Sequence, residues 1–107
     1  MEKEIENLKY NYIHQSETWV YTLNGRPVGF ISLLGHEIGG LFVSPGFQSQ
    51  GIGTQLVDFA YKNRKKLTVN VFERNTKAED FYKKRGFDFI SGHKHSSGYH
   101  LLHLVKT

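Results

Sequence analysis

Short runs of alternating apolar and polar residues dominate the first part of the chain, and this period of two predicts β-strands. Two such runs, at residues 19–23 and 27–34, flank Asn24-Gly25, a dipeptide that favours the tight turn of a hairpin. A third run, Glu37–Val43, is interrupted by Gly39-Gly40, where we expect a β-bulge or a close approach of another backbone. The pattern therefore predicts three consecutive strands.

The spacing of apolar residues becomes helical in two later segments. In the first, over residues 51–66, four apolar residues share one face: Ile52, Leu56, Phe59 and Ala60. The second helix begins after a cap at Asn75 or Thr76 and stops at Gly86. Residues 67–71, 87–90 and 99–105 alternate and predict three more strands, the last two joined by a polar loop over 91–98.

Residues 1–17 are mostly polar, and their few apolar residues lie at helical spacing, which predicts a short amphipathic helix. The predicted order is a helix, three strands, a helix, a strand, a helix and two strands. We therefore expect a single α/β (α+β mixed sheet) domain over residues 1–107.

Composition excludes several function classes. The 107 residues include no cysteine, so a disulfide framework, a thiolate zinc site and a cysteine nucleophile are excluded. His100 and His103 lie three apart on a predicted strand and face opposite sides. His93 and His95 lie in a predicted loop with no acidic partner nearby, so we expect no metal. The acidic start lacks the apolar core of a signal peptide, and no apolar run is long enough for a membrane span. We expect a cytoplasmic protein without a membrane partner.

The net charge of +4 is unevenly distributed. Residues 62–85 hold nine basic and three acidic residues, whereas residues 1–61 hold three basic and six acidic ones. Such a basic segment suits a polyanion, which can be a nucleic acid, an anionic surface or a phosphorylated cofactor. Solubility and favourable charge at helix ends are the alternative explanation.

A glycine-rich turn, Gln48-Ser49-Gln50-Gly51-Ile52-Gly53, lies between a predicted strand and a predicted helix. Free N–H groups at the start of a helix bind anions, and glycines let a ligand approach the backbone. The turn matches neither common phosphate motif, because Leu56 replaces the third glycine of a dinucleotide fingerprint and no lysine follows Gly53. A tight turn without a ligand is the alternative.

Two sequence blocks together resemble the GNAT superfamily of N-acetyltransferases, in particular its small bacterial members. Residues 41–53 resemble the acyl-CoA-binding motif, an apolar strand followed by Arg/Gln-x-x-Gly-x-Gly/Ala at the start of a helix. The second block, Asn75-x-x-Ala78-x-x-Phe81-Tyr82-x-x-x-Gly86-Phe87, looks like the later helix of the family and its following strand. The blocks occur in the family's order, and the resemblance covers roughly residues 18–105.

The resemblance implies that acetyl-CoA is the cosubstrate and lies where two neighbouring strands splay apart. The implied contacts are the backbone of Leu41, Phe42 and Val43 with the acetyl group and pantetheine, and the backbone N–H groups of Gln48, Ser49, Gln50, Gly51, Ile52, Gly53 and Thr54 with the pyrophosphate. Further implied contacts are Asn75, Ala78, Phe81 and Tyr82 from the later helix, and Lys84 and neighbouring basic residues with the nucleotide phosphates. Asn75 has a second interpretation as a plain helix cap, and Phe81 as a core residue.

The resemblance also implies that the phenol of Tyr82 protonates the departing thiolate of CoA. An ordinary phenol has a pKa of about 10 and is neutral at pH 7. A core-edge tyrosine is the alternative. The resemblance also implies a Glu or His near the start of the third strand that removes the amine proton through water. We favour Glu37, because strand alternation puts it on the face of Gly39 and Leu41, whereas the neighbouring His36 faces the other way. For either residue, an exposed turn position without a catalytic role is the alternative.

The chain departs from the family pattern at its start. The usual fold begins with a strand and two helices that help wall the acceptor site, whereas only 18 residues precede Trp19. We therefore expect the first strand and one N-terminal helix to be absent. This leaves an open site for a large acceptor, a wall supplied by a second subunit, or a remnant that only binds CoA. The strand after residue 18 would form an exposed edge, which favours a homodimer.

These observations predict an acetyl-CoA-dependent N-acetyltransferase that transfers an acetyl group to a primary amine by direct attack on the thioester. The acceptor amine is either a small molecule or a protein amine. The alternative is a non-catalytic acyl-CoA-binding or interaction module. A nucleic-acid partner is not expected, because no recognition helix or stripe of basic and aromatic residues is evident.

Overall fold

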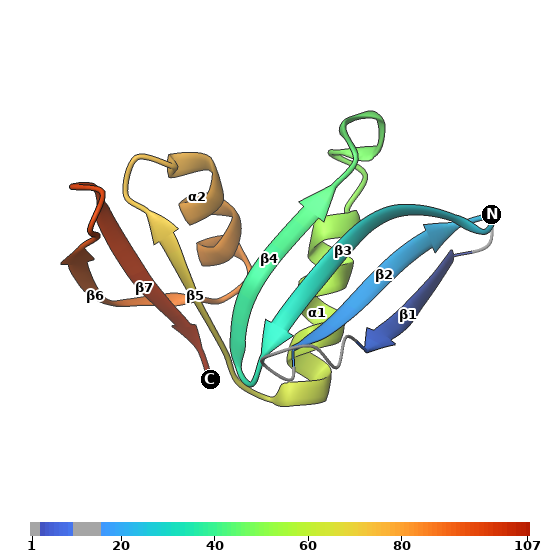
Figure 1. Cartoon of the computed structure of the whole chain (residues 1–107), viewed down its shortest axis with the longest axis horizontal. Helices are drawn as coiled ribbons and strands as arrows, with labels where there is room; N and C mark the ends of the chain where they lie inside the picture. Colours follow the sequence, from blue (N-terminus) through green and yellow to red (C-terminus); the bar gives the residue numbers. More distant parts are fainter. Residues whose placement is uncertain (1–2, 10–15) are drawn as a thin grey trace.

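A computed structural model of the chain describes residues 3–9 and 16–107. It is built on one seven-stranded sheet of order β1-β2-β3-β4-β5-β7-β6, with two α-helices (Figure 1). The strands are β1 Lys3–Lys9, β2 Glu17–Leu23, β3 Arg26–Leu34, β4 Glu37–Val43, β5 Leu67–Phe72, β6 Asp88–Lys94 and β7 His100–Lys106. The helices are α1 Ile52–Arg64 and α2 Thr76–Lys84, and a 3-10 turn covers Pro45–Phe47. The predicted mixed sheet with two helices after its third strand is confirmed.

Two glycine-containing sites shape the first half of the sheet: the turn between β2 and β3, and a bulge in β4. Asn24 and Gly25 both have positive φ, 52° and 79°, which is the geometry that a two-residue hairpin between β2 and β3 requires. The predicted bulge in β4 is confirmed at Gly39, because Ser32 of β3 pairs with Gly40 and Leu33 pairs with Ile38. One residue of β4 is therefore left without a partner on β3.

The start of the chain corrects the sequence prediction. Residues 3–9 form β1 and pair antiparallel with β2 along its whole length, so the helix predicted over 1–17 is wrong there; residues 1–2 and 10–15 lie outside the described residues. The expected absence of a first strand is also wrong. Ile5 lies opposite Tyr21 and packs against the core, and this cross-strand contact outweighs helical spacing. Because β1 covers the edge of β2, the stated reason for a homodimer no longer holds, and the homodimer stays a prediction.

The core lies between the helices and the sheet. Helix α1 buries four side chains: Ile52, Leu56, Val57 and Ala60. They share one buried cluster with Ile31 and Leu33 of β3 and with Val69 and Val71 of β5. Phe59, predicted on the buried face, is only partly buried and meets the ring of Trp19 edge-on at 4.7 Å. No helix among the described residues is long and apolar enough to cross a membrane.

The second half of the sheet follows the prediction with one difference. Helix α2 begins after Asn75, whose side chain caps it, and Gly86 with φ 97° follows its end. β6 extends to Lys94, beyond the predicted end at Ile90, so the connection to β7 is shorter than the predicted polar loop. Pairing with β7 explains the extension, because Lys94 lies opposite His100.

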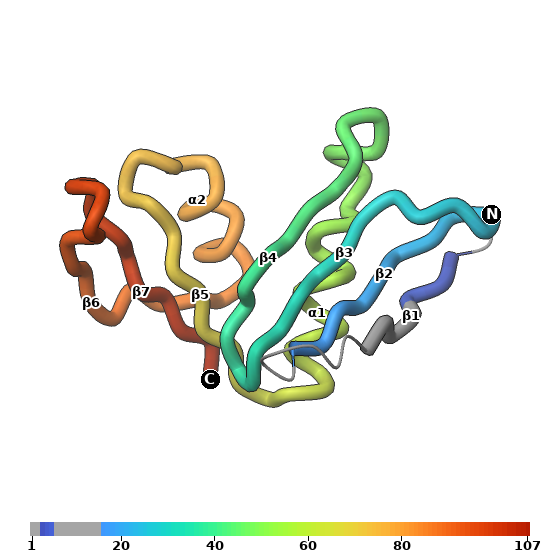
Figure 2. Tube along the Cα trace, viewed as in Figure 1, coloured from blue at the N-terminus to red at the C-terminus, as the bar shows by residue number. Residues whose placement is uncertain are grey.

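The centre of the sheet is open. β4 and β5 are parallel neighbours, and the register joins them at one pair only, Glu37 with Thr68. Beyond that pair the two Cα traces diverge toward the carboxyl ends of both strands (Figure 2). This confirms the splayed strands that the family resemblance implied, and it positions the site.

Candidate active site

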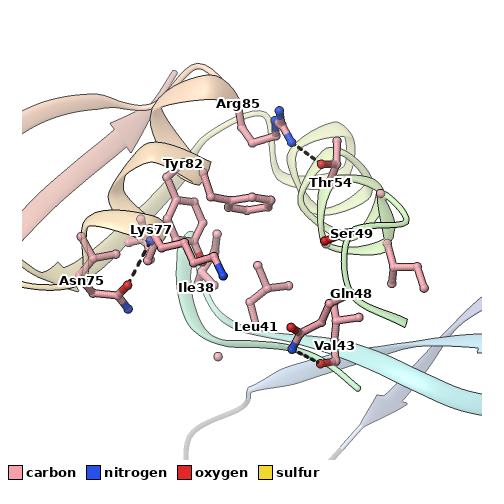
Figure 3. Close-up of a pocket in the computed structure, with 18 of the residues that line it drawn as sticks. Ile38, Leu41, Val43, Gln48, Ser49, Thr54, Asn75, Lys77, Tyr82 and Arg85 are labelled. Atoms are coloured by element: carbon pink, nitrogen blue, oxygen red, sulfur yellow. Dashed lines mark hydrogen bonds between the residues drawn. The ribbon is translucent and has the colours of Figure 1, made fainter. Parts of the chain in front are cut away.

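A cavity of about 820 Å³ lies between the diverging strands β4 and β5 (Figure 3). Its walls come from β4, the glycine turn, the start of α1, β5 and one face of α2. Most of the residues expected to contact acetyl-CoA line it: Leu41, Val43, Gln48, Ser49, Gly51, Ile52, Gly53, Thr54, Asn75, Ala78, Phe81 and Tyr82. Phe42, Gln50, Lys84 and Glu37 are not among the lining residues.

The glycine turn presents the N-terminus of α1 to this cavity. Gly51, with φ 80°, precedes the helix. The first hydrogen bond of the helix runs from the N–H of Gln55 to the carbonyl of Gly51. The N–H groups of the preceding helical turn therefore have no acceptor within the helix, and no side chain caps them. Gln48 fixes the turn by donating from Nε2 to the carbonyl of Val43 at 3.0 Å. This geometry favours an anion.

Two basic side chains that the sequence analysis did not name individually add positive charge. The guanidinium of Arg85 donates to the Oγ1 of Thr54 in the first turn of α1 and lies over the ring of Phe81, 5.2 Å from its centroid. Lys77, near the start of α2, also lines the cavity. Arg85 was identifiable from helical spacing, because it follows Tyr82 by three residues and Phe81 by four.

Tyr82 is the buried aromatic residue of the α2 wall. Its ring is 6% exposed and meets the rings of Phe81 and Phe87 edge-on, each at a centroid distance of 5.2 Å. Burial raises the pKa of Tyr82 to about 12, because a desolvated phenolate is disfavoured. The phenol is therefore neutral throughout the physiological range and can donate a proton or a hydrogen bond.

Asn75 is both the cap of helix α2 and a cavity-lining residue. Its Oδ1 accepts from the N–H of Ala78 at 3.1 Å, which makes it the N-cap of α2. The same residue lines the cavity. Because capping uses only the carbonyl oxygen, the side-chain amide remains a donor for a ligand.

The bulge in β4 overturns the face predicted for Glu37. Ile38 pairs with Leu33 and Leu41 pairs with Ile31, so Ile38 and Leu41 share the cavity face. Glu37 pairs with Leu34 on the opposite face and is exposed. The extra residue inverts the alternation that had aligned Glu37 with Leu41.

Phe42 likewise lies on the face away from the cavity, where its ring stacks with Phe30 at 5.8 Å. His36, the neighbouring candidate base, lies with Nδ1 3.0 Å from the carbonyl of Lys66, to which it donates. No Asp, Glu or His side chain is among the cavity-lining residues in the described part of the chain. Across the same ranges, no three His, Asp or Glu side chains are grouped to hold a metal ion.

Comparison with known proteins identifies the same family that the two sequence blocks resemble. The family model described as "Acetyltransferase (GNAT) domain" matches residues 14–88. The peptidyl-lysine N-acetyltransferase YjaB of Salmonella typhimurium is 42% identical over 85 residues, which cover 78% of this chain and 59% of that protein. The Escherichia coli YjaB is 40% identical over 86 residues, covering 78% of this chain and 58% of its own length. The chain thus spans about three fifths of these curated relatives.

Solved structures agree on the fold. The solution structure of apo-form YjaB from Escherichia coli has a TM-score of 0.75 at 35% identity, with 84% of this chain and 64% of that chain covered. An IAA acetyltransferase from Bacillus cereus has a TM-score of 0.86 at 20% identity, and the match covers 98% of this chain and 99% of that one. At that identity the second similarity concerns the fold alone.

Proposed function

This chain belongs to the GNAT acetyltransferase family, and on that premise we propose that it is an acetyl-CoA-dependent N-acetyltransferase with a single catalytic domain. The observation that carries the proposal is the cavity between β4 and β5, which is lined by a helix N-terminus, by Arg85 and by the buried Tyr82. An anionic thioester and a proton donor for its leaving group would meet in this space.

The proposed binding mode follows from the groups that the cavity exposes. Beyond Glu37, the edge of β4 that faces β5 has no strand partner, so its backbone groups can pair with the amides of pantetheine. The N–H groups at the start of α1, with Arg85 and Lys77, would hold the pyrophosphate. The side-chain amide of Asn75 would donate to the pantetheine arm.

In the proposed reaction the neutral amine of the acceptor attacks the carbonyl carbon of the thioester. The C–S bond breaks as the amide forms, and the sulfur takes a proton from the phenol of Tyr82, which solvent then reprotonates. The amine loses its proton to water, because no carboxylate or imidazole of the described residues lines the cavity. We propose no role for Glu37 in this reaction, because its side chain lies on the other face of the sheet.

The acceptor that we propose is the Nε amine of a lysine in a peptide or protein. Two relatives with about 40% identity are named peptidyl-lysine N-acetyltransferases, and both match the segment that forms the cavity. A third relative with that name, YiaC of Escherichia coli, is 29% identical over 80 residues.

Thermal melting with acetyl-CoA, followed by thiol release with lysine peptides, tests the function. A ligand at 100 times its Kd adds about 2.7 kcal/mol to the free energy of unfolding, which raises the Tm measurably. We expect both a shift and thiol release that depends on the peptide. Absence of a shift would contradict the proposal. A shift without thiol release would instead identify a non-catalytic acyl-CoA-binding module.

A further inference from the structure

A second cavity, of about 580 Å³, opens at the end of β5 beside the proposed acetyl-CoA site. Phe72 and Asn75 line both cavities, so the two spaces adjoin. The remaining walls come from Arg74, two residues after the end of β5, and from three residues at the turn between β6 and β7: His95, Ser97 and Tyr99. The proposed reaction uses none of these three turn residues, which leaves this cavity without a role.

Three of the six residues that line it carry rings: Phe72, His95 and Tyr99. The ring of Phe72 meets those of His95 and Tyr99 edge-on, with centroid distances of 5.7 Å and 6.2 Å. Phe72 is nevertheless 43% exposed and Tyr99 48% exposed. Exposed aromatic surface of this kind gains free energy when an apolar group covers it, and paired rings in a concave surface are typical of recognition sites.

Hydrogen bonds fix the turn that carries two of these rings. The N–H of His95 donates to the carbonyl of Tyr99 at 2.7 Å, and the N–H of Gly98 donates to the carbonyl of His95 at 2.9 Å. The N–H of Ser97 donates to Nδ1 of His95 at 3.1 Å, a third hydrogen bond within the turn. A further bond, from the N–H of Glu73 to the carbonyl of His100 at 2.9 Å, ties the two walls together. The cavity is therefore preformed.

Arg74 gives the cavity its charge. Its guanidinium lies 5.3 Å from the ring centroid of Tyr99. Among the side chains that the structure describes, no carboxylate lies within ion-pair distance of Arg74. The guanidinium is thus available to an anion, and it repels a cation such as the ammonium of the acceptor lysine. The occupant must combine an apolar group with a negative charge.

We propose that this second cavity binds a large apolar side chain of the acceptor peptide, and that Arg74 pairs with an acidic residue beside it. This inference rests on the proposed function, because the adjoining cleft supplies the acetyl group for a lysine close in sequence to the bound segment. Selection of the lysine then depends on its flanking residues, with Phe72 and Tyr99 contacting the apolar group. The cavity is a specificity site for the acceptor.

Fluorescence anisotropy with labelled peptides tests the proposal in the presence of CoA. One peptide carries leucine and glutamate beside a central lysine, and its matched partner carries alanine and glutamine there. We expect about tenfold tighter binding of the first peptide, equivalent to about 1.4 kcal/mol. Arg74→Glu and Tyr99→Ala should each reduce this preference to less than about twofold. Arg74→Glu should further prefer a peptide in which lysine replaces the glutamate.

Two control variants change the same kinds of side chain elsewhere. Phe89→Ala removes a ring of β6 that is 52% exposed and lines neither cavity, and Lys62→Gln removes an exposed charge of α1. Both should keep the peptide preference of the wild-type protein. All four altered side chains are exposed or line the surface cavity, and thermal melting checks that each variant folds.

Three results would overturn the proposal. The wild-type protein binds the two peptides with equal affinity, it binds neither peptide, or Arg74→Glu keeps the full preference for the first peptide. Because anisotropy measures binding without transfer, its result is independent of the chemistry. A peptide preference without acetyl transfer would support the specificity site and contradict the proposed enzyme. Acetyl transfer without any peptide preference would support the proposed enzyme and contradict the specificity site.

Discussion

Tyr82 shows how one buried side chain couples stability to chemistry. Its ring fills the space between Phe81 and Phe87, and burial raises its pKa to about 12. The unfolded chain releases the phenolic proton near pH 10, whereas the folded chain keeps it until about pH 12. Between these values the folded state holds more protons, so the free energy of unfolding falls as pH rises. Below about pH 10 the phenol is protonated in both states, so this group contributes no pH dependence to the free energy of unfolding.

Chemical denaturation from pH 8 to pH 11.5 checks this assignment. Relative to Tyr82→Phe, the wild-type protein should lose up to about 1.4 kcal/mol of unfolding free energy per pH unit above pH 10. The comparison cancels the titration of lysines and other tyrosines, which both proteins share. Parallel curves for the two proteins over this range would show that the Tyr82 phenol is not desolvated.

Arg85 and Lys84 are adjacent in sequence, but only Arg85 lines the cavity and contacts the first turn of α1. Arg85→Gln should therefore weaken acetyl-CoA binding about tenfold, as expected for loss of a charge-assisted hydrogen bond to phosphate. Lys84→Gln makes nearly the same charge change and should weaken binding less than about twofold. Isothermal titration calorimetry distinguishes them, and equal effects would mean that overall charge rather than Arg85 attracts the ligand.

At the scale of single elements, β4 shows what the sequence could and could not predict. The Gly39-Gly40 pair indicated a bulge, and the structure confirms one. The consequence for Glu37 was missed, because the glycine pair was equally compatible with a close approach of another backbone, and only a bulge inverts the face of Glu37 relative to Leu41. That choice depends on the register with β3, a contact between two strands that local spacing does not encode.

The β3–β4 contact also depends on a glycine whose importance local spacing did not reveal. A Cβ on Gly29 would lie 2.9 Å from the carbonyl oxygen of Phe42, a backbone atom, whereas a Cβ on Gly39 would meet nothing nearer than 3.9 Å. Gly29→Ala should lower the free energy of unfolding by about 1–3 kcal/mol through this clash. Gly39→Ala serves as the control and should change it by less than about 0.5 kcal/mol. Urea denaturation measures both, and similar values for the two variants would contradict the packing described for β3 and β4.

At the scale of the whole molecule, motifs predicted the site better than periodicity predicted the start of the chain. The glycine turn, the cap at Asn75 and the wall residue Tyr82 each lie where a local signal placed them, and the structure brings all three to one cavity. Residues 3–9 were misassigned because a strand at the sheet edge depends on pairing with β2, which lies more than ten residues away for most pairs. The basic segment predicted an anionic ligand, but only the fold shows that Arg85 and Lys77 face the cavity.

In the proposed reaction, the cavity between β4 and β5 brings acetyl-CoA and a lysine amine together, and Tyr82 acts as the acid in the acetyl transfer. Mass spectrometry of a lysine peptide incubated with acetyl-CoA, with free thiol measured in parallel, tests it most directly. The wild-type protein should acetylate the Nε atom and release one thiol per acetyl group. Tyr82→Phe should keep the acetyl-CoA-dependent rise in Tm but lower kcat by about 10²-fold or more, whereas Tyr61→Phe, a tyrosine outside the cavity, should retain kcat. Wild-type protein that binds acetyl-CoA but leaves the peptide unmodified, or an undiminished kcat in Tyr82→Phe, would contradict the claim.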